Sequence, residues 1–222
     1  SYLNLDKNNF LGYLPDTEPL KNLDSRNSDV LKLKELSLAI PKLLLTNKIR
    51  NQIDKLPSSF LSHDLNTYSE KELRCLNVQF SFLSHAYVWG DLNPSKILPA
   101  CLAKPWVNIS NLLGRPAVLS YASYCLDNWH KIESDQPVSL DNVALNYNFL
   151  GGIDEDWFVT IHVCIENEAK LAIKSALDIA VAYEEKRISN DFVLDKLTNI
   201  KESMLNVNHI FRKMPEKCDP YI

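Results

Sequence analysis

The sequence predicts a mainly α-helical protein, and two observations support this fold class. Apolar residues recur every three or four positions over several long stretches, which is the period of a helix with one buried face. Glycine is scarce, with 5 in 222 residues, whereas an average composition of about 7% would give roughly 15. A β-sandwich needs many tight glycine turns, so this scarcity argues against an all-β class.

The composition also excludes several functional classes. The glycines are too dispersed to form a G-x-G-x-x-G or P-loop motif, which excludes Rossmann-type cofactor binding and Walker-type NTP hydrolysis. The net charge of −4 provides no basic field to recruit phosphates, so we expect no nucleic-acid partner. No apolar run reaches the roughly 18 residues that span a bilayer, so we expect no membrane association.

Cysteine usage indicates the cellular compartment. The five cysteines are widely spaced, with no C-x-x-C pair, which excludes zinc ribbons and thioredoxin-like motifs. Free thiols are typical of a reducing compartment. The first residues also lack the charged and apolar leader of a secreted protein. We therefore expect a cytoplasmic protein.

The N-terminal part of the chain is predicted to be an irregular arm followed by two helices. Residues 1–27 are polar and form the arm. A helical period begins at Ser28, which suits an N-cap, and Pro41 is expected to break or restart it. A second helix is expected to carry the apolar residues of 44–56 and to end before Pro57.

The central part begins with the clearest helix start in the sequence. Ser69 and Glu72 fit a capping box, and the apolar residues that follow recur at helical spacing as far as Tyr87. Two prolines within 95–110 are expected to exclude a long helix there. The next expected elements are a helix over 116–130, a polar connection over 131–141 and a strand within 142–149.

Two long helices are predicted at the C-terminal end. Three acidic residues at 154–156 favour a helix N-terminus, and the helix continues without Gly or Pro to about Arg187. Residues 169–182 are apolar on nearly every side, so we expect them deep in a core. Ser189 begins the last helix, which ends at Pro215. Its heptad-like stripe indicates a contact inside the core, with a partner helix as the alternative.

The most suggestive polar residues lie near the start of the first long helix. Phe158, His162 and Glu166 are spaced four residues apart, so they share one helix face. A buried His or Glu must be hydrogen-bonded or shifted in pKa. Spacing alone leaves two interpretations open. Either His162 is a core residue bonded to Glu166 or to a backbone carbonyl, or the face binds a ligand.

Other candidate chemistry is weaker. The histidines form no H-x-x-x-H or H-E-x-x-H motif, so no zincin-type metal site is expected. Cys164 and His162 lie on different helix faces and cannot form a catalytic pair. Cys125 is interpreted as a small core residue rather than a nucleophile.

Four segments together resemble the indoleamine 2,3-dioxygenase family, in matching order and spacing. They are FLSHAYVWG at 82–90, ILP at 97–99, LSYASYCLDNW at 119–129 and WFVTIHVCIE at 157–166. The resemblance implies a small N-terminal helical domain with minor strands, residues 1–149, and the first helices of a larger haem-binding domain, residues 150–222. It implies haem b and dioxygen acting on tryptophan, or on a related indole, to open the 2,3 bond to an N-formylkynurenine-type product.

The resemblance also implies roles for individual residues. Tyr121, Cys125 and the neighbouring Tyr124 match positions around the substrate pocket, and Phe158 matches the residue that packs against the indole. His162 matches a catalytic distal position that is serine in the mammalian enzymes. An imidazole there could accept the indole N–H or hold bound oxygen, as the distal histidine does in the related tryptophan 2,3-dioxygenases.

A second departure from the family concerns the iron ligand. The family's axial histidine would follow Ile222, so no metal ligand is assigned within the chain. We expect a fragment whose partner is the remaining C-terminal part of the large domain. Two other functions stay open, namely a non-catalytic haem or oxygen-binding protein on the same scaffold and a cofactor-free helical interaction module.

Overall fold

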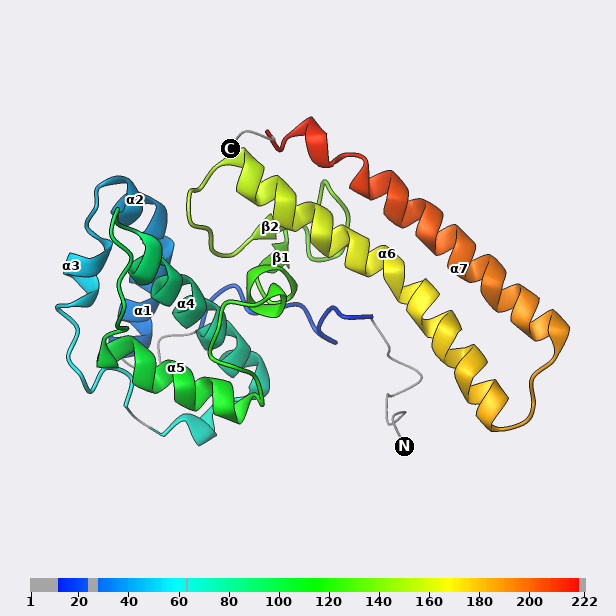
Figure 1. Cartoon of the computed structure of the whole chain (residues 1–222), viewed down its shortest axis with the longest axis horizontal. Coiled ribbons are helices and arrows are strands. Elements are labelled where there is room, and N and C mark those ends of the chain that lie inside the picture. The colour runs from blue at the N-terminus through cyan, green and yellow to red at the C-terminus, as the bar shows by residue number, and fades with distance from the viewer. Residues whose placement is uncertain (1–11, 24–27, 63, 220–222) are drawn as a thin grey trace.

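The computed structural model describes residues 12–23, 28–62 and 64–219, and this part of the chain is mainly helical, as predicted. Helices α1 to α5 gather at one side, whereas α6 and α7 run side by side as a long pair toward the other side (Figure 1). The helices and strands are α1 (Ser28–Leu38), α2 (Ile40–Leu45), α3 (Ile49–Ile53), α4 (Glu70–Trp89), α5 (Ala100–Leu112), β1 (Trp129–Lys131), β2 (Val143–Leu145), α6 (Ile153–Glu184) and α7 (Asn190–Phe211). Three short helical turns are η1 (Leu65–Thr67), η2 (Ala122–Leu126) and η3 (Met214–Glu216).

The first three helices correct the prediction of one helix over 44–56. Pro41 restarts the helix as predicted, because it lies in the first turn of α2. Asn47, between α2 and α3, adopts a left-handed conformation with φ of 53°. A left-handed residue ends the ladder of helical hydrogen bonds. Two short helices therefore replace the single one.

Helix α4 is the centre of the main core. Its predicted capping box is confirmed, because the Glu72 amide donates to Ser69 Oγ at 3.3 Å and the Ser69 amide donates to Glu72 Oε2 at 2.8 Å. Phe80 and Phe82 are completely buried. Helices α1, α3 and α5 pack around α4, so this helix anchors the first part of the chain.

Helix α5 corrects the expectation that prolines exclude a long helix within 95–110. Pro99 is the N-cap, where the helix does not use the amide of that residue. Pro105 lies inside the helix and removes one hydrogen bond of its ladder. Leu102 and Trp106 are buried against the core, and this burial offsets the lost bond.

The expected helix over 116–130 is also wrong, because it is reduced to the π turn η2. The chain then enters β1, which pairs antiparallel with β2. Asn128 stabilises this change of direction. Its side chain donates to the Tyr147 carbonyl at 2.8 Å and accepts from the Tyr147 amide at 2.9 Å. The strand predicted within 142–149 is confirmed over the three residues of β2.

Helix α6 forms over nearly its predicted length, but residues 169–182 do not lie deep in a core. Leu171, for example, is 42% exposed. In the described part of the chain, α7 is the main element packed along this stretch, so the other sides of α6 remain open. Helix α7 begins after the predicted cap, because Ser189 Oγ accepts from the Phe192 amide.

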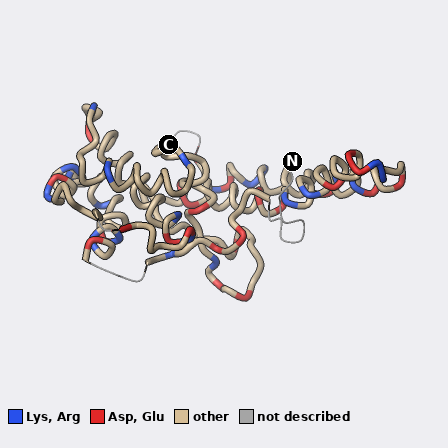
Figure 2. The backbone as a smooth tube through the Cα atoms, turned by 90° about the horizontal axis from the view of Figure 1, so that it is seen from below, with Lys and Arg blue, Asp and Glu red and all other residues tan. Residues whose placement is uncertain are grey.

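The long helix pair formed by α6 and α7 carries charges of both signs. Lys and Arg are interspersed with Asp and Glu along it, as Figure 2 shows. This distribution fits the small net charge of −4. Among the helices described, none is both long and apolar enough to cross a lipid bilayer.

Candidate functional site

Tyr121, Tyr124 and Cys125 lie on or beside the π turn η2. The Asp127 amide donates to the Ala122 carbonyl at 2.8 Å, an i to i+5 bond that widens the turn. Such π turns are frequent at functional sites. Because η2 packs against α6, side chains from two distant parts of the chain meet there.

Three aromatic side chains and an imidazole form an open cluster, which we call the α6 face: Tyr121, Tyr124, Phe158 and His162. The ring centroids of Phe158 and His162 are 4.3 Å apart, and those of Tyr121 and His162 are 5.9 Å apart. The Tyr124 ring lies 6.4 Å from that of Phe158. Phe158 is 40% and Tyr121 44% exposed, so aliphatic neighbours do not fill this edge of α6. The structure thus brings four of the five predicted site residues together.

The His162 ring is oriented by a backbone bond. Its Nδ1 lies 2.7 Å from the carbonyl oxygen of Phe158. A carbonyl oxygen only accepts, so Nδ1 carries a proton and donates it. In the neutral ring, Nε2 is therefore an acceptor. Spacing left two interpretations of His162 open. The backbone hydrogen bond of the first interpretation is present. The ring is also half-buried beside the open face, as the second interpretation requires.

Two carboxylates of α6 bind the two tyrosines. Tyr121 Oη donates to Glu166 Oε1 at 2.9 Å, and Tyr124 Oη donates to Glu155 Oε1 at 3.3 Å. Burial first, and then the adjacent carboxylate, raises the pKa of each phenol. Both tyrosines are therefore neutral hydrogen-bond donors at neutral pH.

Cys125 lies on the buried side of η2. It is fully buried and packs in a second apolar cluster with Val159, Val163 and Cys164. Burial raises the pKa of its thiol to about 12, which keeps it protonated. It does not share the open face of the other four residues, so its place in the pocket wall stays a prediction.

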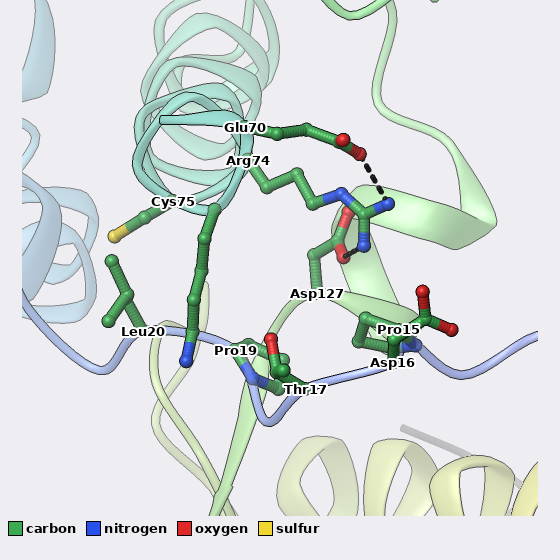
Figure 3. A pocket seen from close by; sticks show the side chains of 10 residues that line it. Pro15, Asp16, Thr17, Pro19, Leu20, Glu70, Arg74, Cys75 and Asp127 are labelled. Carbon is green, nitrogen blue, oxygen red and sulfur yellow. Dashed lines mark hydrogen bonds and ion pairs between the residues drawn. The ribbon is translucent and has the colours of Figure 1, made fainter. Parts of the chain in front are cut away.

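Asp127 is a buried, ion-paired residue beside η2 that the sequence reasoning missed. It follows directly on η2 and is only 4% exposed. Arg115 Nη1 lies 2.6 Å from Asp127 Oδ2, and Arg74 Nη1 lies 3.7 Å from Oδ1. Arg74 also binds Glu70 at 2.7 Å, beside a pocket of about 240 Å³ (Figure 3). A charged residue next to an apolar turn is the signal that could have indicated this network.

A larger hollow of about 730 Å³ opens at the C-terminal end of α4. Its walls are mostly apolar and include the exposed side chains of Trp89 and Leu92. Phe149 lines this hollow and stacks on Tyr124 with ring centroids 6.3 Å apart. A residue that lines the hollow is therefore in contact with one residue of the α6 face.

Known proteins are similar to this chain over most of its length. The family model described as Indoleamine 2,3-dioxygenase matches residues 5–222. Indoleamine 2,3-dioxygenase of Saccharomyces cerevisiae is 28% identical over 217 residues, which cover 95% of this chain and 47% of that protein. Indoleamine 2,3-dioxygenase 1 of Rattus norvegicus is 31% identical over 184 residues, or 82% of this chain and 44% of that protein. A Haliotis madaka protein named Myoglobin is 27% identical over 190 residues, with coverage of 83% and 46%. The chain spans about half the length of these curated relatives.

Proposed function

The chain belongs to the indoleamine 2,3-dioxygenase family, and on that premise we propose that the complete protein is a haem-dependent dioxygenase. Its substrate is tryptophan or a related indole, and its product is of the N-formylkynurenine type. The observation that carries this proposal is the α6 face, where an imidazole acceptor nitrogen lies among partly exposed aromatic rings. The remaining C-terminal part of the large domain completes the site.

The α6 face fits a flat apolar group such as haem b together with an indole. Phe158 and Tyr121 keep much of their ring surface exposed. Aromatic rings favour offset-stacked and edge-to-face contacts with other planar systems. Haem, when bound, supplies the redox chemistry that activates dioxygen. The axial histidine that the family implies is assigned to no residue of this chain.

The chain's own residues bind and orient the substrate. Phe158 packs against the indole ring, and His162 Nε2 accepts the indole N–H, because Nδ1 already donates to the Phe158 carbonyl. Tyr121 and Tyr124, the other two residues of the α6 face, exclude water from one side of the substrate. Holding the indole in one orientation lowers the entropic part of the barrier.

The test uses the protein expressed from its complete coding sequence and loaded with ferrous haem, L-tryptophan and dioxygen. A kynurenine-type product is expected, and no such product under these conditions contradicts the proposal. His162→Ala should lower kcat/KM about 5- to 30-fold, since one hydrogen bond contributes about 1–2 kcal/mol. His209→Ala, at the exposed end of α7, is the matched control and should have no effect.

An N-methylated indole substrate tests the acceptor role of His162 directly. With the wild-type protein, kcat/KM for the methylated substrate should fall by about the same factor as in His162→Ala, because this substrate has no N–H to donate. With His162→Ala, methylation of the substrate should lower kcat/KM little further. A full methylation penalty in the variant would mean that another group accepts the indole N–H.

A second candidate function is a non-catalytic, oxygen-binding haem protein on the same scaffold. The similarity to the protein named Myoglobin favours this alternative. A stable oxygenated spectrum of the haem-loaded protein, without turnover of tryptophan, would support it against the dioxygenase.

A further inference from the structure

Glu166 lies one turn beyond His162 on the same face of α6 and has no role in the proposed substrate contacts. Its Oε1 accepts the hydroxyl of Tyr121 at 2.9 Å, across 45 residues of sequence. The bond therefore connects the beginning of the η2 segment to the middle of α6. A hydrogen bond to a charged acceptor is stronger than one between neutral groups.

Tyr121 in turn packs against His162. The two rings meet edge to face, with centroids 5.9 Å apart and an interplanar angle of 73°. On its other side, the imidazole contacts the Phe158 ring at 4.3 Å. The His162 ring is thus held between two aromatic rings while its Nδ1 donates to a backbone carbonyl. A flip of the imidazole would have to break that bond and displace a neighbouring ring.

We propose that Glu166 is a positioning residue, which anchors Tyr121 and thereby holds the His162 ring with Nε2 directed to the open face. The consequence for turnover rests on the proposed function, whereas the effect on ring orientation does not. Without the anchor, Tyr121 can leave His162, because the residue is 44% exposed. The imidazole then gains a second orientation, in which Nε2 no longer meets the substrate.

The chemistry of the pair indicates which substitutions separate geometry from charge. Burial and the Glu166 carboxylate raise the pKa of Tyr121, so the hydroxyl remains a donor. Glu166→Gln keeps a carbonyl oxygen that accepts this donor. Glu166→Ala removes the acceptor, and Tyr121→Phe removes the donor. Glu184→Ala, at the exposed end of the same helix, is the matched control.

The first measurement is independent of activity and uses NMR on the 222-residue chain. In the wild type we expect ring-to-ring NOEs between Tyr121 and His162, and ¹⁵N shifts of a ring protonated at Nδ1. Glu166→Ala and Tyr121→Phe should weaken the NOEs or mix the two tautomers, whereas Glu166→Gln and Glu184→Ala should keep the wild-type pattern. The NOE between Tyr124 and Phe158 reports that the fold is intact.

The second measurement compares N–H and N-methyl indole substrates with the complete haem-loaded protein. Glu166→Ala should raise KM about 3- to 10-fold, with a smaller change in kcat, and should reduce the preference for the N–H substrate. Glu166→Gln should stay within about twofold of the wild type. A structural defect alone would lower the active fraction and leave both KM and this preference unchanged.

The outcomes distinguish the two proposals. Wild-type NOEs and tautomer in Glu166→Ala would overturn the positioning role, whatever the kinetics. A changed NMR pattern with an unchanged N–H preference would overturn its consequence for the substrate. A changed NMR pattern, combined with a wild-type protein that forms no product, would refute the dioxygenase function and leave the positioning role supported.

Discussion

Replacing Asp127 by Asn removes the carboxylate that binds two arginines at the end of η2. The side chain of Asp127 is 3% exposed, and its oxygens lie 2.6 Å from Arg115 and 3.7 Å from Arg74. Loss of one partner from a buried ion pair costs about 3–5 kcal/mol. Both arginine side chains are 28% exposed, so water partly solvates them after the change. The Asn oxygen also still accepts one bond, and we expect a loss of about 2–3 kcal/mol.

The assay is equilibrium unfolding of the 222-residue chain in urea. The variant and the wild type are compared with the same dependence of the unfolding free energy on urea concentration. For a chain of this length, the expected loss corresponds to a fall in Tm of about 4–12 °C. Asp91→Asn is the control, because Asp91 pairs with Arg50 at 3.4 Å and its side chain is 53% exposed. An exposed pair of this kind contributes less than about 1 kcal/mol.

The comparison of the two variants decides whether the Asp127 network stabilises η2. Equal losses from Asp127→Asn and Asp91→Asn, within about 0.5 kcal/mol, would refute the reasoning. The buried pair would then contribute no more than a surface pair.

Two further predictions follow from burial and packing. Burial raises the thiol pKa of Cys125 and Cys164 to about 12 from a usual value of 9.0. The folded chain thus holds these protons more tightly than the unfolded chain, so stability should be complete below pH 9 and fall as the pH rises from about 9 toward 12. Urea midpoints at pH 7.5, 9 and 10 measure this, and a flat profile would contradict it. Gly90→Ala should cost about 1–3 kcal/mol, because the added Cβ would clash with the backbone carbonyl oxygen of Ala86 and would also lie 2.5 Å from Leu44 Cδ2. Gly152→Ala, whose Cβ meets nothing within 4 Å, should cost less than about 1 kcal/mol by the same assay, because only the poorer N-cap of α6 is lost.

Sequence reasoning succeeded where neighbouring residues of one helix decide the geometry. Ser69 and Glu72 are three residues apart and form their capping box within one turn. Phe158 and His162 share a face because their spacing alone places them one helical turn apart. Both features follow from the helical period, and neither requires knowledge of the rest of the fold.

The same period was misleading at 116–130. Its apolar spacing fits a helix, yet Asn128 finds its hydrogen-bond partners in Tyr147, and Asp127 is bound by Arg74 and Arg115. These bonds join residues that are distant along the chain, so no local pattern records them. The helical turn therefore ends at Leu126, and β1 begins at Trp129.

The sequence by itself determined the helical class, the family and the order of residues along the α6 face, because these depend on local spacing and residue identity. Only the tertiary structure decided that Tyr121 binds Glu166 and that residues 169–182 keep an open side. A periodic pattern specifies which residues share a face of a helix. Which element then covers that face depends on contacts between distant parts of the chain.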